Sequence, residues 1–291
     1  MSTTAGTPTF LDQLPDEPSV DRFQIGSRHW PSICLDPYQA LLPAFFLPNI
    51  RAIECSNIRG DMDSMPLGPD APDPHTSPIT TIDMNSSDMR LATFEKLLRL
   101  PKALVVYRHR NAQFINNGCT LSEIVKLLSK YQASSLEILT LDGLESTEVF
   151  AEPRSATELF YTPKGIGSLR HFEKLRVIEA PYWSLVTCPN WEKLPDADKP
   201  SFLDILPRSL EVLKLTLDEF PMRLMGYLYN QLETLIRKKK EMYPRLTRVE
   251  VIKRYDVKTE RPEWNFGYTS KDFIEWVGIL AMSEKVDLVI H

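Results

Sequence analysis

Histidine and cysteine side chains are the groups in this sequence best suited to catalysis or metal binding, and they are widely separated. They are His29, His75, His109, His171 and His291, and Cys34, Cys55, Cys119 and Cys188. No cysteine pair has the C-x-x-C spacing of a zinc ribbon or a redox dithiol, and no metal-ligand spacing occurs among the histidines. Motifs for phosphate loops, zinc proteases, nucleophile elbows and dinucleotide binding are also absent. We therefore expect no cofactor, no metal ion and no enzymatic activity, and an enzyme of unknown type is the least favoured alternative.

A set of polar residues is instead spaced for recognition. They recur within the pattern apolar-x-x-apolar-x-apolar, where the residue between the last two apolar positions points away from the core of a β-strand. This position is occupied by Glu54, Asp83, Arg108, Thr140, Glu179, Lys214, Glu250 and Ile290. The flanking residues Asn85, Arg110, Asp142 and Arg248 extend the set. We predict that these polar residues form a solvent-facing surface that binds a protein partner. Glu54 beside Asp83 is expected to be repulsive unless Arg108 or a partner compensates.

The repeated pattern must supply the strands that position this surface. It begins at residues 50, 79, 104, 136, 175, 210, 246 and 286. The clearest copies are Leu136, Leu139, Leu141 and Leu210, Leu213, Leu215, whereas the last copy, Val286, Val289, His291, is weak at its end. A unit recurring every 25–40 residues is typical of a repeat protein.

Helical patterns lie between the predicted strands. Thr120 and Glu123 form a capping box before an apolar face in residues 121–128, and Thr93 precedes a shorter run that Pro101 ends. A longer helix is predicted over 222–242, and a last one over 270–282. The buried positions expected in these two helices are Leu224, Leu228, Leu232 and Leu235, then Phe273, Trp276, Val277 and Leu280.

Alternating strands and helices predict an α/β fold of parallel strands joined by crossovers. We expect an irregular leucine-rich-repeat solenoid, with strands on the concave face and helices on the convex face. Residues 41–291 form this domain, and residues 1–40 form an N-terminal segment that is partly flexible or capping. Insertions are predicted near 60–78, 143–165 and 182–200. The third carries Trp183 and Trp191, either as binding anchors or, more commonly, folded over the core.

Composition limits the compartment and the partners. The net charge of −5 argues against nucleic acid as a partner. The sequence contains no apolar run of 18 residues, so we expect no membrane span. Four reduced thiols and no secretion signal favour a cytoplasmic or nuclear protein, which we expect to be a monomer. The acidic stretch 60–78 is interpreted as a disordered loop, with an acidic docking loop and a metal site as alternatives. The basic stretch 237–254 is either a polar helix face or a docking patch.

Five segments around the predicted strands have similar local sequences, namely residues 41–51 (LLPAFFLPNIR), 77–80 (SPIT), 100–104 (LPKAL), 135–139 (SLEIL) and 206–213 (LPRSLEVL). These segments resemble the repeat region of filamentous-fungal F-box/leucine-rich-repeat proteins. The similarity extends over residues 38–291. It implies a non-catalytic, substrate-recruiting module of an SCF-type ubiquitin ligase, in which an F-box binds the Skp1 adaptor and the repeats bind the substrate. An orphan structural scaffold without a ligase role is the alternative.

The beginning of an F-box-like phrase occurs near the N-terminus. Residues 14–17 read LPDE, but Pro18 and the polar stretch to Ser27 interrupt the apolar helices that an F-box requires. An F-box is therefore not recognisable. A Skp1-type adaptor is expected as a partner only if an F-box is present elsewhere.

Overall fold

The structure is a computed structural model of the 291-residue chain. It describes residues 21–26, 41–56, 59–60, 73–113, 119–144, 165–186, 201–217, 225–253 and 270–290. Four predicted features fall largely or wholly outside these residues, namely the F-box-like phrase, most of the acidic stretch, most of the second insertion, and most of the third insertion with Trp191.

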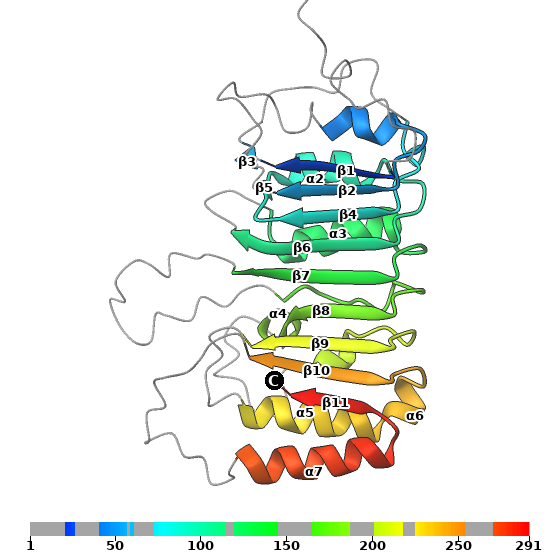
Figure 1. Ribbon diagram of the computed structural model, residues 1–291. Coiled ribbons are helices and arrows are strands. Elements are labelled where there is room, and N and C mark those ends of the chain that lie inside the picture. Colours follow the sequence, from blue (N-terminus) through cyan, green and yellow to red (C-terminus); the bar gives the residue numbers. More distant parts are fainter. Residues whose placement is uncertain are drawn as a thin grey trace, which may run out of the picture.

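The fold is built on one sheet of nine parallel strands (Figure 1). In spatial order the strands are β1 (Arg22–Gly26), β2 (Ala52–Ser56), β4 (Thr81–Asn85), β6 (Val106–Gln113), β7 (Ile138–Leu144), β8 (Val177–Pro181), β9 (Val212–Leu217), β10 (Arg248–Lys253) and β11 (Asp287–Ile290). Each strand therefore pairs with the next of these strands along the chain, as in a repeat protein. A second, two-stranded sheet pairs β3 (Arg59–Gly60) with β5 (Asp88–Met89).

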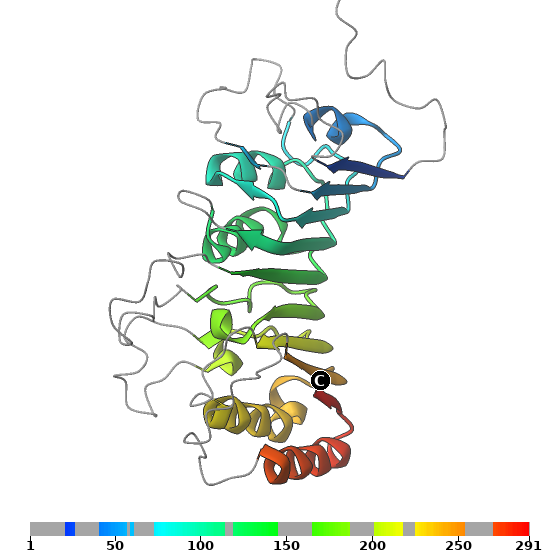
Figure 2. The same cartoon turned by 60° about the vertical axis from the view of Figure 1, so that its left-hand side comes forward.

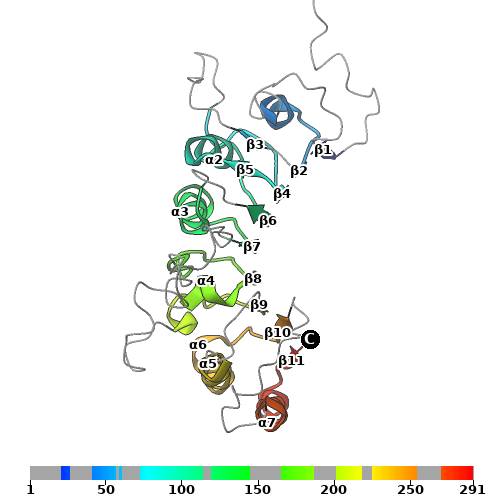
Figure 3. The same cartoon turned by 90° about the vertical axis from the view of Figure 1, so that its left-hand side faces the viewer.

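Helices cover one side of the sheet (Figure 3). They are α2 (Leu91–Leu98), α3 (Leu121–Gln132), α4 (Tyr182–Val186), α5 (Met225–Arg237), α6 (Lys239–Met242) and α7 (Ser270–Ser283), with 3-10 turns at Leu42–Phe46 and Phe202–Asp204. No described helix lies on the opposite side, which we call the open face. The column of strands bows toward the helices at its middle, so the open face is concave (Figure 3). Figure 2 shows that the stack is elongated, with α7 at its C-terminal end.

The core lies between the sheet and the helices, where the repeated apolar positions meet. The central position of the pattern forms a single register row of Phe23, Ile53, Ile82, Tyr107, Leu139, Ile178, Leu213, Val249 and Leu288. Alternation of buried and half-buried residues along β2 and β4 is what strands packed on one face require. The capping box of Thr120 and Glu123 is confirmed at the start of α3.

A ninth strand is present where the pattern search found none. β1 falls within residues 1–40 and pairs with β2, so part of the N-terminal segment extends the sheet. Its sequence RFQIG has alternating apolar residues but lacks a leucine at the start of the motif. The pairing with β2 identifies this segment as a strand, because its sequence alone has no strong strand pattern.

The last repeat was predicted in the wrong register. Leu288 and Ile290 align with the core residues Val249 and Val251, whereas Val289 aligns with Glu250 on the open face. Ile290 therefore faces the core and not the solvent, and Val289 is not a core position. His291, the other predicted core position, lies outside the described residues. A shift of one residue exchanges the two faces of a strand. Here the final unit has one residue fewer between its first two core positions.

Three further predictions need correction. Trp276 of α7 is 39% exposed, whereas Val277 and Ala281 are buried against the core. The third predicted insertion begins with α4, in which Tyr182 and Leu185 are buried and Trp183 is half-buried, so residues 182–186 belong to the packed layer. The helix predicted over 222–242 is divided at Lys238 into α5 and α6.

Candidate protein-recognition surface

Seven of the predicted polar residues form one continuous row across the open face, which Gln24 and Val289 extend at its two ends. Register pairing runs from Gln24 through Glu54, Asp83, Arg108, Thr140, Glu179, Lys214 and Glu250 to Val289. We call these nine residues the polar row. Because adjacent strands are about 4.8 Å apart, neighbouring side chains in the row can interact directly.

At the N-terminal end of the row, acidic residues are compensated by arginines. The Arg108 and Arg110 guanidinium groups lie 3.7 Å and 3.2 Å from the Asp83 carboxylate. Glu54 instead contacts Arg22 at 3.0 Å and accepts a hydrogen bond from Gln24, both on β1. We call Arg22, Glu54, Asp83, Arg108 and Arg110 the first ion cluster. The expected compensation by Arg108 is therefore present, and the unpredicted strand β1 contributes a further cation, Arg22.

A second ion cluster lies at the C-terminal end and consists of Lys214, Arg248, Glu250 and Asp287. The Lys214 ammonium lies 3.0 Å from the Glu250 carboxylate, and Arg248 contacts both Glu250 and Asp287. Burial raises the pKa of Glu250, but hydrogen bonds and charge from Lys214 and Arg248 outweigh it, and the net pKa is below the ordinary value. Glu250 therefore stays ionised in a buried position because two cations hold it.

An apolar stripe lies between the two clusters, and the sequence analysis did not identify it. Val106, Ile138, Val177 and Val212 share one register row, two residues before the polar row, and all four are half-buried. Each of them lies two positions before a residue of the polar row. This constant spacing is the sequence pattern from which they could have been predicted. They occupy the spacer directly before the middle apolar residue of the pattern, a position for which the sequence analysis made no prediction.

Not all of the predicted surface residues face solvent. Thr140, Asp142 and Glu250 are buried. Thr140 has a short side chain between Arg108 and Glu179 in the row, and Glu250 is covered by its ion-pair partners. Asn85, Arg110 and Arg248 are exposed, and Glu54, Asp83, Arg108, Glu179 and Lys214 are half-buried. The prediction of a fully solvated row is therefore wrong at Thr140, Asp142 and Glu250.

Charge reversal at Lys214 is expected to destabilise the fold, because Lys214 forms an ion pair with the buried Glu250. Lys214→Glu would place a second carboxylate beside the buried Glu250, and we expect the free energy of unfolding to fall by about 1–3 kcal/mol. Lys214→Met, which removes the cation without adding an anion, should cost less. The swap Lys214→Glu with Glu250→Lys should recover part of the loss. Urea denaturation measures all three, and unchanged stability of Lys214→Glu would show that the pair has no structural role.

The buried side chains of Tyr107 and His109 lie on the core side of the sheet and not on the open face. His109 is fully buried, and its Nε2 donates a hydrogen bond to the Ser87 carbonyl oxygen at 2.9 Å. The Tyr107 hydroxyl lies 3.4 Å from His109 Nδ1 and is also buried. These groups contact no cavity that the structure describes, and they pack within the core. Among the described residues, no group of three or more acidic, histidine or cysteine side chains is arranged to hold a metal ion.

Together, the fold and this face define a repeat-built α/β protein with a parallel sheet open on one side. Comparison with family models, curated proteins and solved structures finds no match to the chain. Within the described part of the chain, no helix is both long and apolar enough to cross a membrane.

Proposed function

We propose that this protein is a non-catalytic protein–protein interaction module, a leucine-rich-repeat solenoid whose recognition surface is the open face. The observation that carries the proposal is the apolar stripe running in register between two ion clusters on the side of the sheet that no described helix covers. A shallow surface of this kind suits a protein partner, because small molecules are usually enclosed in deeper cavities.

The chemistry of the surface limits the partner. The side chains of Arg22, Arg110 and Arg248 are partly exposed, at 58%, 47% and 44%. They lie in the clusters at the two ends of the apolar stripe, where they can pair with carboxylates on a partner. We therefore infer that the partner presents an apolar segment bordered by acidic side chains. Shape and apolar contact would supply affinity at the centre, and the arginines would supply orientation at the rim.

Substitution at the centre of the stripe tests this role. Val177→Lys places a charge among half-buried apolar side chains, whereas its stem can still cover the sheet. The matched control is Leu91→Lys, which changes an exposed apolar residue of α2 in the helix layer. In affinity capture with quantitative mass spectrometry, the amount of partner recovered with Val177→Lys should fall by about tenfold or more. The amount recovered with Leu91→Lys should equal that of the wild type. Thermal unfolding of both variants shows that they are folded. Equal recovery by the wild type and Val177→Lys would reject the open face as the recognition surface.

A finer proposal places the module in a cytoplasmic or nuclear SCF-type ubiquitin ligase as its substrate-recruiting part. It rests on the resemblance of residues 38–291 to fungal F-box/leucine-rich-repeat proteins. The thiol of Cys55 is buried and forms no disulfide within the described part of the chain, which is in keeping with a reducing compartment. Pull-down of purified Skp1 by the full chain tests the adaptor role. Absence of binding would remove this role and leave the module as a binding protein or a structural scaffold.

A further inference from the structure

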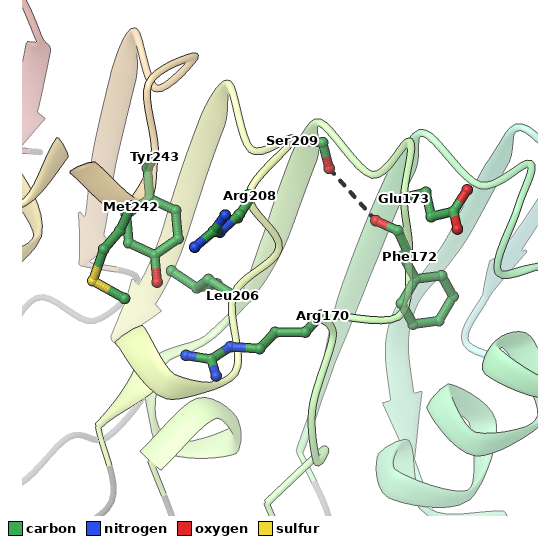
Figure 4. A pocket seen from close by; sticks show the side chains of 8 residues that line it. All are labelled: Arg170, Phe172, Glu173, Leu206, Arg208, Ser209, Met242 and Tyr243. Atoms are coloured by element: carbon green, nitrogen blue, oxygen red, sulfur yellow. Dashed lines mark hydrogen bonds between the residues drawn. The ribbon is translucent and has the colours of Figure 1, made fainter. Parts of the chain in front are cut away.

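A pocket lies at the edge of the sheet where the strands begin, between the loops that precede β8, β9 and β10 (Figure 4). Its volume is about 440 Å³, within the range of sites that hold small organic ligands. Phe172, Leu206 and Tyr243 form its buried wall, one from each loop. The pocket contains no residue of the polar row or the apolar stripe, so its role is independent of the proposed function.

Two arginines make one end of the pocket cationic. Figure 4 shows that the side chains of Arg170 and Arg208 both extend toward Tyr243 and Met242, whereas the Glu173 carboxylate lies at the far end and points away from them. The guanidinium group of Arg170 is held by the Leu203 carbonyl oxygen at 3.4 Å and by Asp204 at 3.8 Å.

Arg208 differs from Arg170 because it is exposed and has no carboxylate within ion-pair distance in the part of the chain that the structure describes. Its five donors are therefore open to a ligand. The nearby hydroxyl groups are already engaged, since Tyr243 donates to the Leu203 carbonyl oxygen and Ser209 donates to that of Leu175. The pocket thus combines a fixed cation, a free cation and an apolar wall.

We propose that this pocket binds a small organic anion in which a carboxylate or phosphate group is attached to a flat apolar group. Arg208 would bind the anionic group through paired N–H donors, a geometry that guanidinium shares with carboxylates and phosphates. Arg170 adds a second positive charge on the same side. The apolar part of the ligand would rest against Leu206 and the ring of Tyr243, where its burial contributes to binding.

Ligand-observed NMR titration of the full chain tests the site with four probes. Phenyl phosphate and phenylacetate carry both features, benzyl alcohol lacks the charge, and inorganic phosphate lacks the apolar group. We expect at least one of the two aromatic anions to bind at millimolar concentration and more tightly than benzyl alcohol and inorganic phosphate. The two aromatic anions also show whether phosphate or carboxylate is preferred.

Variants then locate the binding. Arg208→Gln should lower the affinity for the aromatic anion by about tenfold, because a charged hydrogen-bonding group is lost. Arg170→Gln should lower this affinity as well. The control is Lys102→Gln, an exposed cation at the same edge of the sheet, before β6. Its affinity should equal that of the wild type. Failure of both aromatic anions to bind, equal affinity for inorganic phosphate, unchanged affinity of Arg208→Gln, or an equal loss in Lys102→Gln would each overturn the proposal. None of these outcomes depends on binding at the open face.

Discussion

Replacing Leu139 with alanine is expected to lower the free energy of unfolding by about 2–5 kcal/mol. Leu139 lies in β7, near the middle of the sheet, and is fully buried. Its neighbours in the core row are Tyr107 on β6 and Ile178 on β8, and strand pairing fixes both. The neighbouring backbone therefore cannot close around the removed atoms, and the cost includes a cavity as well as lost apolar burial.

The adjacent residue supplies a control for the Leu139 prediction. Ile138 points to the opposite face and is only half-buried, so Ile138→Ala should cost about 1 kcal/mol. Both variants remove atoms from the same strand, which separates the effect of the core from that of strand propensity. Chemical denaturation followed by circular dichroism gives the two values. A loss below about 1 kcal/mol for Leu139→Ala, or a larger loss for Ile138→Ala, would mean that the two faces of β7 are interchanged.

Acidification from pH 7 to pH 4 is expected to remove about 3 kcal/mol of stability through His109 alone. Burial lowers the pKa of His109 to about 4, although the hydrogen bond to Ser87 and the charge of Asp142 act in the opposite direction. The unfolded chain, with a pKa near 6.5, binds the proton more tightly than the folded protein does. Stability from this group is therefore complete above pH 6.5 and falls as the pH decreases toward 4.

His109→Gln isolates this contribution from the titration of carboxylates. Glutamine cannot titrate but keeps an N–H donor for the Ser87 carbonyl oxygen. The free energy of unfolding of the variant should therefore fall less steeply below pH 6.5 than that of the wild type. The measurement is urea denaturation of both proteins at a series of pH values. Parallel curves would show that the histidine is protonated equally in both states.

The strands could be predicted because each copy of the apolar pattern is local. Seven of the eight predicted copies supply core residues in the predicted phase, from Ile53 on β2 to Val249 on β10. The eighth copy is out of phase because either Leu288 or Val289 can occupy the middle apolar position. Pairing of Leu288 with Val249 on β10 selects the first of these registers. β1 was missed because only its pairing with β2 distinguishes it from other short apolar segments.

The polar row was also predictable, but its exposure and its ion pairs, apart from that of Asp83 with Arg108, were not. Side-chain alternation places Glu54, Asp83 and Lys214 on the open face without knowledge of any neighbour. Whether a row residue is exposed depends on the side chains beside it. Glu250 is buried because the side chains of Lys214 and Arg248 cover it. These two residues lie 36 and two positions before Glu250 in the sequence.

The sequence by itself determined the repeated strands, the capped helix at Thr120 and the outward direction of the polar residues, because these follow from periodicity and short-range hydrogen bonding. Only the tertiary structure decided the ninth strand, the register of the last one, the pairing of the charges and the pocket at Arg208. Each of these joins residues from different repeats. Their spacing along the chain varies with the length of each unit, so no local pattern specifies which of them meet.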